Sequence, residues 1–220
     1  MKKHIVFDLD GTLVDSLPGI AEGVRRALGK MRRPLPTAEA VRGMIGLGAR
    51  HLCARALGYP DVETTPAELL EQVYAHFCRE YPHCWQGDGT QPFDGIPRLL
   101  RQLSERGAHL AVLSNKPHDV TLPMVREIFG AIPIDPIMGY TGKFPRKPAP
   151  DALLHIAQQW GQSPESIVLV GDSLYDALTA QAAGCQPILV TWGYSCETDV
   201  RTLGAPVADT VSGLSELLLR

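Results

Sequence analysis

The sequence predicts an α/β fold in which a doubly wound parallel sheet carries an inserted α-helical domain. A short apolar run, His4–Phe7, is typical of a buried strand, and alternating strand and helix patterns resume only after residue 92. The residues between show helical spacing and no strand pattern. Alternating strands and helices imply right-handed βαβ units whose sheet is covered on both faces. We therefore expect a core domain over residues 1–16 and 92–220 and a helical cap domain over residues 17–91.

Four helices are expected in the inserted domain. The first is "LPGIAEGVRRALGKM", whose apolar residues recur at helical spacing. The second, "TAEAVRGMIG", has Thr37 as its N-cap, and the third, "GARHLCARALG", ends at Gly58. The fourth is "TPAELLEQVYAHFCREYP", with Thr65 as the cap and Pro66 at the first helical position.

The core domain is expected to alternate regularly after residue 92. In chain order the segments are the helix "GIPRLLRQLSERG", the strand "HLAVLSN", the helix "VTLPMVREIFG", the short strand "PIDPIMGY", the helix "DALLHIAQQWG", the strand "SIVLVGDS", the helix "DALTAQAAG" and the strand "PILVTWG". The segments "VADTV" and "SELLL" close the chain.

Composition places the chain among ordinary globular proteins. Of the 220 residues, 45% are hydrophobic and 20% are charged, and the net charge is -3 without a basic stripe, so we expect no nucleic-acid partner. No apolar run approaches the roughly 18 residues of a membrane span, so no membrane association is expected. The five cysteines form no C-x-x-C pair, which indicates free thiols and a cytoplasmic location. No feature of the sequence predicts an oligomeric state.

Polar side chains collect where the predicted strands end. These residues are Asp8 and Asp10 after the first strand, Ser114 and Asn115 after "HLAVL", Asp172 and Asp176 after "SIVLVG", and Lys147 just before a helix that starts near Pro150. Ligands of open α/β sheets bind outside the carboxyl ends of the strands, and parallel strands bring all of those ends to one edge. We therefore expect these side chains to converge.

The expected cluster suits the transfer of a phosphoryl group. Three carboxylates at one edge repel each other and have raised pKa values unless a cation is present. Mg2+ prefers such oxygen ligands together with phosphate and water. Lysine, serine and asparagine can donate to phosphate oxygens, and Gly11 permits a tight turn after Asp10. An aspartate nucleophile is a known form of covalent catalysis.

Four segments together resemble the motifs of the haloacid dehalogenase-like (HAD) phosphohydrolases. They are "DLDGTLVDS", "LSN", "RKPAPD" and "GDSLYD", which occur in that order between Asp8 and Asp176. The helical insertion after the first motif resembles the small α-helical cap of this superfamily, and the alternating remainder resembles its Rossmann-like core.

The resemblance implies catalytic and metal-binding roles for four aspartates. Asp8 would attack phosphorus to form an aspartyl phosphate. Asp10 would protonate the leaving alkoxide and then deprotonate the hydrolytic water. Mg2+ would be bound by the carboxylates of Asp8 and Asp172 and by the main-chain carbonyl of Asp10, with Asp176 supporting the metal.

The resemblance also implies a set of phosphate-binding residues. Ser114 and Lys147 would hold the transferring phosphoryl group, with Asn115 and the backbone amides after Asp8 assisting. Thr12 belongs to the same loop and would position Asp10.

Several candidates also have an ordinary structural interpretation. Asp10-Gly11 is a common turn pair, and Asp172 or Ser173 could cap a helix. Asp176 could simply favour the N-terminal end of a helix through the helix dipole. Arg50 follows the Gly-rich turn "MIGLG" of the cap, where it could bind a substrate carboxylate or second phosphate, or be a solvated helix residue.

Among HAD groups the best match is to phosphoglycolate phosphatases. The segments "GLGARHLCARAL", "PFDGIPRLLRQLSERGAHLAVLSNKP" and "VGDSLYD" resemble that group. The resemblance implies a Mg2+-dependent phosphatase for a small phosphate monoester, with phosphoglycolate as the leading substrate. A mutase of the beta-phosphoglucomutase type and a pyrophosphatase remain alternatives within the superfamily. A non-catalytic binding protein on the same scaffold is the alternative outside enzymes.

Overall fold

The chain divides into two compact units. The structure is a computed structural model that describes residues 1–220, apart from the side chains of residues 197 and 198. Residues 1–14 and 92–220 form the first unit, called here the α/β unit, and residues 15–91 form the second, the helical unit.

Six parallel strands form the sheet of the α/β unit, in the order β5-β4-β1-β6-β7-β8. They are β1 (His4–Phe7), β4 (His109–Pro117), β5 (Ile137–Tyr140), β6 (Ile167–Gly171), β7 (Gln186–Val190) and β8 (Val207–Ala208). The expected doubly wound sheet is confirmed. Strand order reverses on either side of β1, and ligands of such sheets bind at this switch point.

The register of the three central strands sets the level of the residues that follow them. Phe7, the last residue of β1, lies opposite Val112 of β4 and Val170 of β6. Polar residues that come just after these positions therefore lie at one edge of the sheet, beside one another.

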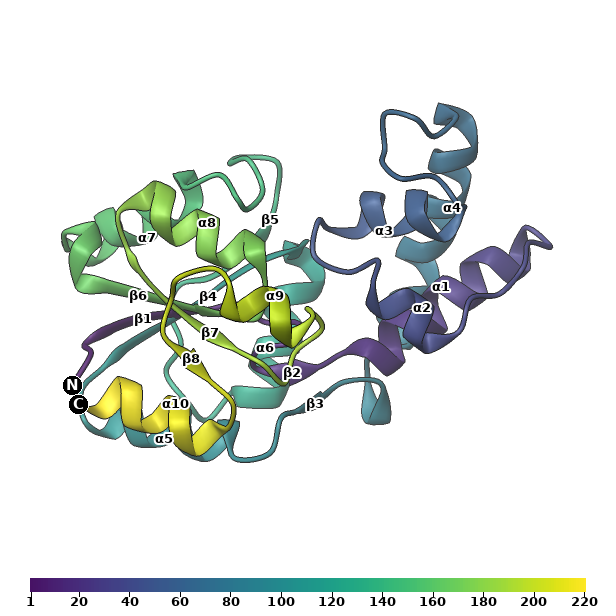
Figure 1. The fold of residues 1–220 in the computed structure, drawn as a ribbon. Helices are drawn as coiled ribbons and strands as arrows, with labels where there is room; N and C mark the ends of the chain where they lie inside the picture. Colours follow the sequence, from purple (N-terminus) through teal and green to yellow (C-terminus); the bar gives the residue numbers. More distant parts are fainter. The chain divides into compact units, whose positions relative to one another are not determined.

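Helices cover both faces of the sheet. They are α5 (Ile96–Glu105), α6 (His118–Phe129), α7 (Asp151–Trp160), α8 (Leu174–Ala183), α9 (Glu197–Arg201) and α10 (Val211–Leu219), with a 3-10 turn at Pro164–Ser166. Figure 1 shows α7 and α8 on one face and α5 and α10 on the other. Because both faces are covered, the central strands are apolar throughout, and Ile5, Val6 and Leu169 are completely buried.

The helical unit is built from α1 (Leu17–Lys30), α2 (Ala38–Arg42), α3 (Ala49–Ala56) and α4 (Ala67–Glu80), with 3-10 turns at Tyr81–His83 and Gly87–Gly89. Helices α1 and α4 pack closely: a Cβ at Gly23 would lie 3.1 Å from ring atoms of both Phe77 and Tyr81. The expected N-cap of α2 is confirmed, since Thr37 Oγ1 accepts from the Ala40 amide at 3.2 Å.

The start of α4 differs from the expectation. Pro66 is the N-cap residue rather than the first helical residue, and α4 begins at Ala67. The Thr65 hydroxyl donates to the Asp61 carbonyl at 2.7 Å instead of capping the helix. The reason is a local turn that begins at Asp61, whose side chain also accepts from the Thr64 amide at 2.8 Å.

Two short strands form the connections between the units. Strand β2 (Val14–Asp15) leaves the α/β unit and β3 (Gln91–Pro92) returns to it, and the two pair in a separate sheet. The Phe93 amide extends this pairing by donating to the Leu13 carbonyl at 3.1 Å. The beginning and the end of the insertion are therefore adjacent.

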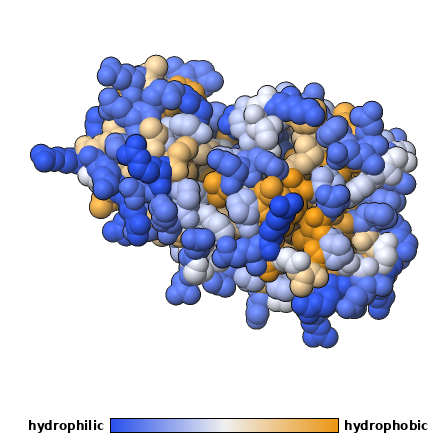
Figure 2. Space-filling model, turned by 180° about the vertical axis from the view of Figure 1, so that it is seen from behind, coloured by the Kyte–Doolittle hydropathy of each residue, from blue (hydrophilic) through white to orange (hydrophobic). Residues whose placement is uncertain are grey.

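The face of the molecule drawn in Figure 2 is mostly hydrophilic. Figure 2 shows one face of the molecule, on which apolar side chains gather over the α/β unit and blue side chains surround them. None of the helices in the described part of the chain combines the length and apolar character needed to cross a bilayer.

Helix α7 offers a matched pair of leucines that tests the packing of the core. Leu153 is fully buried against the sheet, whereas its neighbour Leu154 is 38% exposed. We expect Leu153→Ala to lower the free energy of unfolding by about 2–5 kcal/mol, because it removes buried methyl groups and leaves a cavity. Leu154→Ala is expected to change it by less than about 1 kcal/mol. Urea denaturation measures both, and equal losses would contradict this packing.

Candidate active site

Three buried carboxylates meet at the carboxyl edge of the sheet. Asp8 directly follows β1, Asp172 directly follows β6, and Asp176 lies in the first turn of α8. One carboxylate oxygen from each of the three lies within 4.8 Å of the others, and all three residues are buried. Such an oxygen-only donor set fits a hard divalent cation.

Lys147 provides the positive charge of this cluster. Its Nζ lies 2.8 Å from Asp8 Oδ1 and 2.5 Å from Asp176 Oδ1, and its side chain is only 4% exposed. A buried lysine is tolerated when it is paired and hydrogen-bonded in this way. Lys147 and Asp8 are far apart in sequence, and the fold brings them together as expected.

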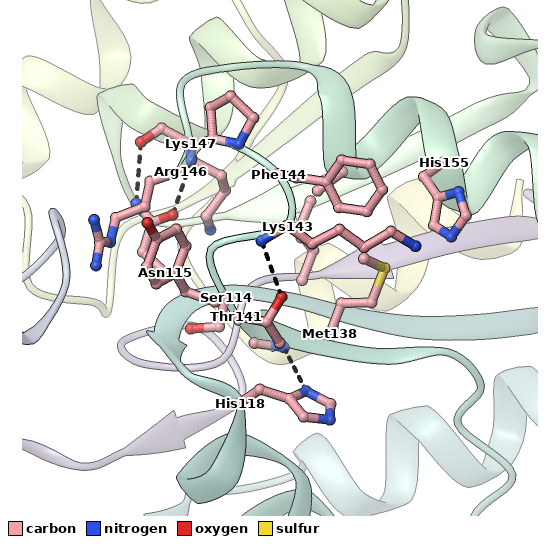
Figure 3. A pocket seen from close by; sticks show the side chains of 15 residues that line it. Ser114, Asn115, His118, Met138, Thr141, Lys143, Phe144, Arg146, Lys147 and His155 are labelled. Atoms are coloured by element: carbon pink, nitrogen blue, oxygen red, sulfur yellow. Dashed lines mark hydrogen bonds between the residues drawn. The ribbon is translucent and has the colours of Figure 1, made fainter.

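Asn115 holds the backbone of Lys147. The Asn115 side chain donates to the Lys147 carbonyl at 3.0 Å and accepts from the Lys147 amide at 2.8 Å. Figure 3 shows both bonds as dashed lines between Asn115 and the chain at Lys147. The amide group of Asn115 thus fixes the segment that carries the buried lysine, which is a positioning function not foreseen from the sequence.

Asp176 both caps a helix and holds Lys147. Its Oδ2 accepts from the Ser173 amide at 3.1 Å and from Ser173 Oγ at 2.5 Å, completing a capping box at the start of α8. Its Oδ1 accepts from Lys147. Both oxygens already have donors, so this geometry favours a supporting position beside the cation. Of the two caps considered, Ser173 is the N-cap and Asp172 is not.

Asp172 is enclosed by a loop that sequence reasoning missed. This loop follows β7, and the Tyr194 amide in it donates to Asp172 Oδ2 at 2.6 Å. A Cβ on Gly193 would lie 2.2 Å from the same oxygen, so only glycine permits the close approach. A Cβ on Gly11, which has a φ of 79°, would lie 2.6 Å from that oxygen. The signal in the sequence was Gly193 itself, which lies three residues after the end of β7.

Asp10 has an unexpected partner in Lys116. Lys116 Nζ lies 2.9 Å from Asp10 Oδ1, and the two side chains are 5% and 12% exposed. Lys116 was not among the expected site residues, although it directly follows the "LSN" segment. The Lys116 amide donates to Ser114 Oγ at 3.2 Å.

Ser114 and Asn115 lie in β4, as the strand "HLAVLSN" predicts, but β4 continues past them to Pro117. The pairing of β4 with β5 is irregular between Leu113 and Pro117. This irregularity lets consecutive side chains of one strand reach different neighbours instead of alternating regularly.

The Thr12 hydroxyl makes no hydrogen bond to Asp10. The Thr12 hydroxyl is completely buried and has no hydrogen-bond partner, while the Thr12 carbonyl accepts from Trp192 Nε1 at 3.2 Å. The Thr12 backbone is therefore fixed, and its hydroxyl has unused donor capacity.

The cluster has strongly perturbed proton affinities. Burial, reinforced by Asp176 and Asp172, raises the pKa of Asp8 to about 8 against the opposing effect of Lys147. Burial and Asp176 raise the pKa of Asp172 to about 7, which the Tyr194 amide partly offsets. Burial alone would lower the pKa of Lys147, but Asp176 and Asp8 outweigh it and the pKa is raised. A divalent cation here would favour the ionised carboxylates.

A cavity of about 160 Å³ adjoins these residues. Ser114, Asn115 and Lys147 form part of its wall, together with Tyr140 and Arg146 (Figure 3). The Arg146 guanidinium lies 3.5 Å from the centre of the Tyr140 ring, which fixes its charge beside the cavity.

Arg50, the remaining candidate, belongs to the helical unit. It lies near the start of α3, where its guanidinium forms an ion pair with Glu71 and lies 5.0 Å from the centre of the Tyr74 ring. Its proposed contact with substrate stays a prediction.

Carboxylates and a buried lysine at the switch point of a doubly wound sheet define a hydrolase-type site for an anionic substrate. A family model described as haloacid dehalogenase-like hydrolase matches residues 2–184. The chain belongs to the haloacid dehalogenase-like hydrolases.

Curated relatives and solved structures agree with this membership. The phosphoglycolate phosphatase of Thiobacillus denitrificans is 34% identical over 194 residues, which cover 88% of this chain and 85% of the relative. That of Psychrobacter arcticus is 31% identical and covers 100% of this chain and 96% of its own. A crystal structure from Haemophilus somnus, described as a predicted phosphoglycolate phosphatase, has a TM-score of 0.88 at 26% identity and covers 98% and 97% of the two chains.

The raised carboxylate pKa values predict how stability depends on pH. Because Asp8 and Asp172 bind protons more tightly in the folded state, unfolding becomes easier as pH rises from about 4 to about 8. A bound cation displaces those protons, so its affinity should increase up to about tenfold per pH unit for each proton displaced. We expect the Mg2+-induced rise in Tm, measured against EDTA, to increase between pH 6.5 and 8.

Asp8→Asn is the control for this experiment, since it removes one titrating carboxylate. The Mg2+-induced rise in Tm should increase less between pH 6.5 and 8 in this variant than in the unmodified protein. A Mg2+-induced Tm shift that is equally large at every pH would contradict the burial of these groups.

Gly193→Ala tests the packing around Asp172. The new Cβ would collide with three atoms of the Asp172 side chain, and the carboxylate must move. We expect Mg2+ affinity, measured by isothermal titration calorimetry, to fall about 10–100-fold. Gly29→Ala is the matched control, because a Cβ at this position in helix α1 has no atom within 4 Å. Unchanged affinity in Gly193→Ala would contradict the close approach.

Proposed function

We propose that this protein is a Mg2+-dependent phosphatase that hydrolyses a small phosphate monoester through an aspartyl-phosphate intermediate. The observation that carries the proposal is the Asp8 carboxylate, held 2.8 Å from buried Lys147 in a trio of carboxylates. Covalent catalysis needs a nucleophile next to a charge that stabilises the transferring group, and this arrangement supplies both.

In the first half of the reaction, a carboxylate oxygen of Asp8 bonds to phosphorus while the bond from phosphorus to the ester oxygen breaks. Asp10 gives its proton to the leaving oxygen. Lys147 and Ser114 donate to the phosphoryl oxygens, and the Thr12 hydroxyl is a further donor available in the loop. Asp8, Asp172 and the Asp10 carbonyl would hold Mg2+, which would neutralise the carboxylates and polarise the phosphoryl group.

In the second half, water attacks the phosphorus of the aspartyl phosphate. Asp10 takes the proton of this water, the bond between Asp8 and phosphorus breaks, and inorganic phosphate leaves. Two carboxylates two residues apart can therefore share one strand end without sharing a role, since one forms the covalent bond and the other moves protons.

Phosphoglycolate is the substrate we propose. Two curated relatives that carry this activity in their names are 31% and 34% identical over most of the chain. In the helical unit, Arg50 remains our candidate for a residue that selects the substrate, since Glu71 and Tyr74 hold its guanidinium in place.

A panel of phosphate esters tests the activity. Purified protein with Mg2+ should release inorganic phosphate from phosphoglycolate faster than from pyrophosphate or hexose phosphates, and EDTA should abolish the release. Isomerised sugar phosphate without free phosphate would instead identify a mutase. No hydrolysis of any ester would refute the proposed function.

Replacing Asp8 and Asp10 one at a time tests their separate roles in the reaction. With p-nitrophenyl phosphate as substrate, Asp8→Asn should form no phosphoenzyme, because no carboxylate remains to bond phosphorus. Asp10→Asn should still form it, since p-nitrophenolate leaves without a proton, and should hydrolyse it about 10²–10⁴-fold more slowly. The amount of phosphoenzyme and its rate of hydrolysis are measured by acid quenching of reactions in which the phosphoryl group of the substrate is labelled. If Asp8→Asn protein became labelled, another residue would be the nucleophile.

A further inference from the structure

A second buried lysine lies at the site, and the proposed chemistry does not use it. Lys116 is 7% exposed as a whole residue, and its ammonium lies 2.9 Å from Asp10 Oδ1. Burying a lysine is unfavourable unless its charge is compensated, so its presence at the edge of the sheet requires an explanation.

The backbone of Lys116 is held on both sides. Its amide donates to Ser114 Oγ at 3.2 Å, and its carbonyl accepts from Thr121 Oγ1 of α6 at 3.3 Å. A Cβ on Gly139 of β5 would lie 2.8 Å from the same carbonyl, so the neighbouring strand packs directly against it. The side chain of Lys116 therefore starts from a rigid point on β4.

The two buried lysines are partners of different aspartates. Lys147 contacts Asp8, the proposed nucleophile, whereas Lys116 contacts Asp10, the proposed proton donor to the leaving oxygen. Lys147 is therefore associated with the phosphoryl group, and Lys116 with the leaving group.

This position sets the reach of Lys116. A proton donor lies about 2.6–3.2 Å from the oxygen it protonates, and Lys116 Nζ lies 2.9 Å from Asp10 Oδ1. The Lys116 ammonium therefore lies within roughly 6–8 Å of the ester oxygen, depending on which Asp10 oxygen carries the proton. A carboxylate attached one carbon away from the ester oxygen fits within this distance. An ammonium group has three donors, so Lys116 can bind this carboxylate while it keeps its bond to Asp10.

We propose that Lys116 is a specificity-determining residue that binds a carboxylate on the leaving group, which directs the enzyme toward phosphate esters of small α-hydroxy acids. This inference rests on the proposed function. The residue that would recognise the substrate carboxylate then belongs to the α/β unit, on the same strand as Ser114.

A matched pair of substrates tests the inference. Phosphoglycolate and 2-hydroxyethyl phosphate have the same carbon chain, but only the first has a carboxylate. We expect Lys116→Met to lower the ratio of their kcat/KM values about 10–100-fold, mainly through KM for phosphoglycolate, because a charge-assisted hydrogen bond is lost. Lys116→Arg keeps the charge and should retain most of the ratio. Lys3→Met, which changes an exposed lysine just before the amino end of β1, is the control and should leave it unchanged.

The alternative is that Lys116 only orients Asp10. In that case Lys116→Met slows both substrates equally and leaves the ratio unchanged, which would overturn the inference. A ratio as low in Lys116→Arg as in Lys116→Met would also overturn it. Should Lys116→Met not fold, Lys116→Gln is measured in the same way.

Failure of the inference can be told apart from failure of the proposed function. If the unmodified protein with Mg2+ hydrolyses neither substrate nor any other ester, the proposed function fails, and the inference with it. If it hydrolyses both substrates and the ratio does not respond to Lys116, the function stands and the inference alone fails.

Discussion

The burial of like charges is the constraint on which the rest of the site depends. Asp8, Asp172 and Asp176 place carboxylate oxygens within 4.8 Å of one another where little water can reach them. Such an arrangement is unstable without compensating positive charge and fixed donors. Lys147 supplies the charge, the Tyr194 amide and the Ser173 hydroxyl supply donors, and glycines make room for the carboxylates. Features far apart in sequence therefore serve one electrostatic requirement.

The same requirement explains why so much of the edge is rigid. Asn115 binds the backbone of Lys147 at both its amide and its carbonyl, and the capping box of α8 fixes Asp176. A buried charge that moved by one ångström would lose its partner and remain desolvated, which is costly. The start of α8 and the irregular stretch of β4 at Ser114 therefore hold the charged groups in place, in addition to their part in the fold.

Sequence reasoning predicted the fold well because its signals are local. Apolar strands of four or five residues, separated by amphipathic helices, identify a parallel sheet, and residues that follow such strands must meet. It could not predict which donor faces which carboxylate. Lys116 looked like any polar residue after a strand, and Gly193 like any turn glycine, because their importance arises from contacts with Asp10 and Asp172. The start of α4 was wrong for a similar reason, since a turn at Asp61 competes for Thr65.

The pairing of β2 with β3 gives the chain a modular architecture. The helical unit is joined to the α/β unit through two paired strands, β2 and β3. At the point of insertion the chain therefore leaves and returns at adjacent positions, as it would in a short hairpin. Insertions at such positions are tolerated because they need not disturb the packed elements on either side. Evolution can therefore lengthen, replace or remove the helical unit while the charge cluster remains intact. One set of buried groups can in this way be combined with many different insertions.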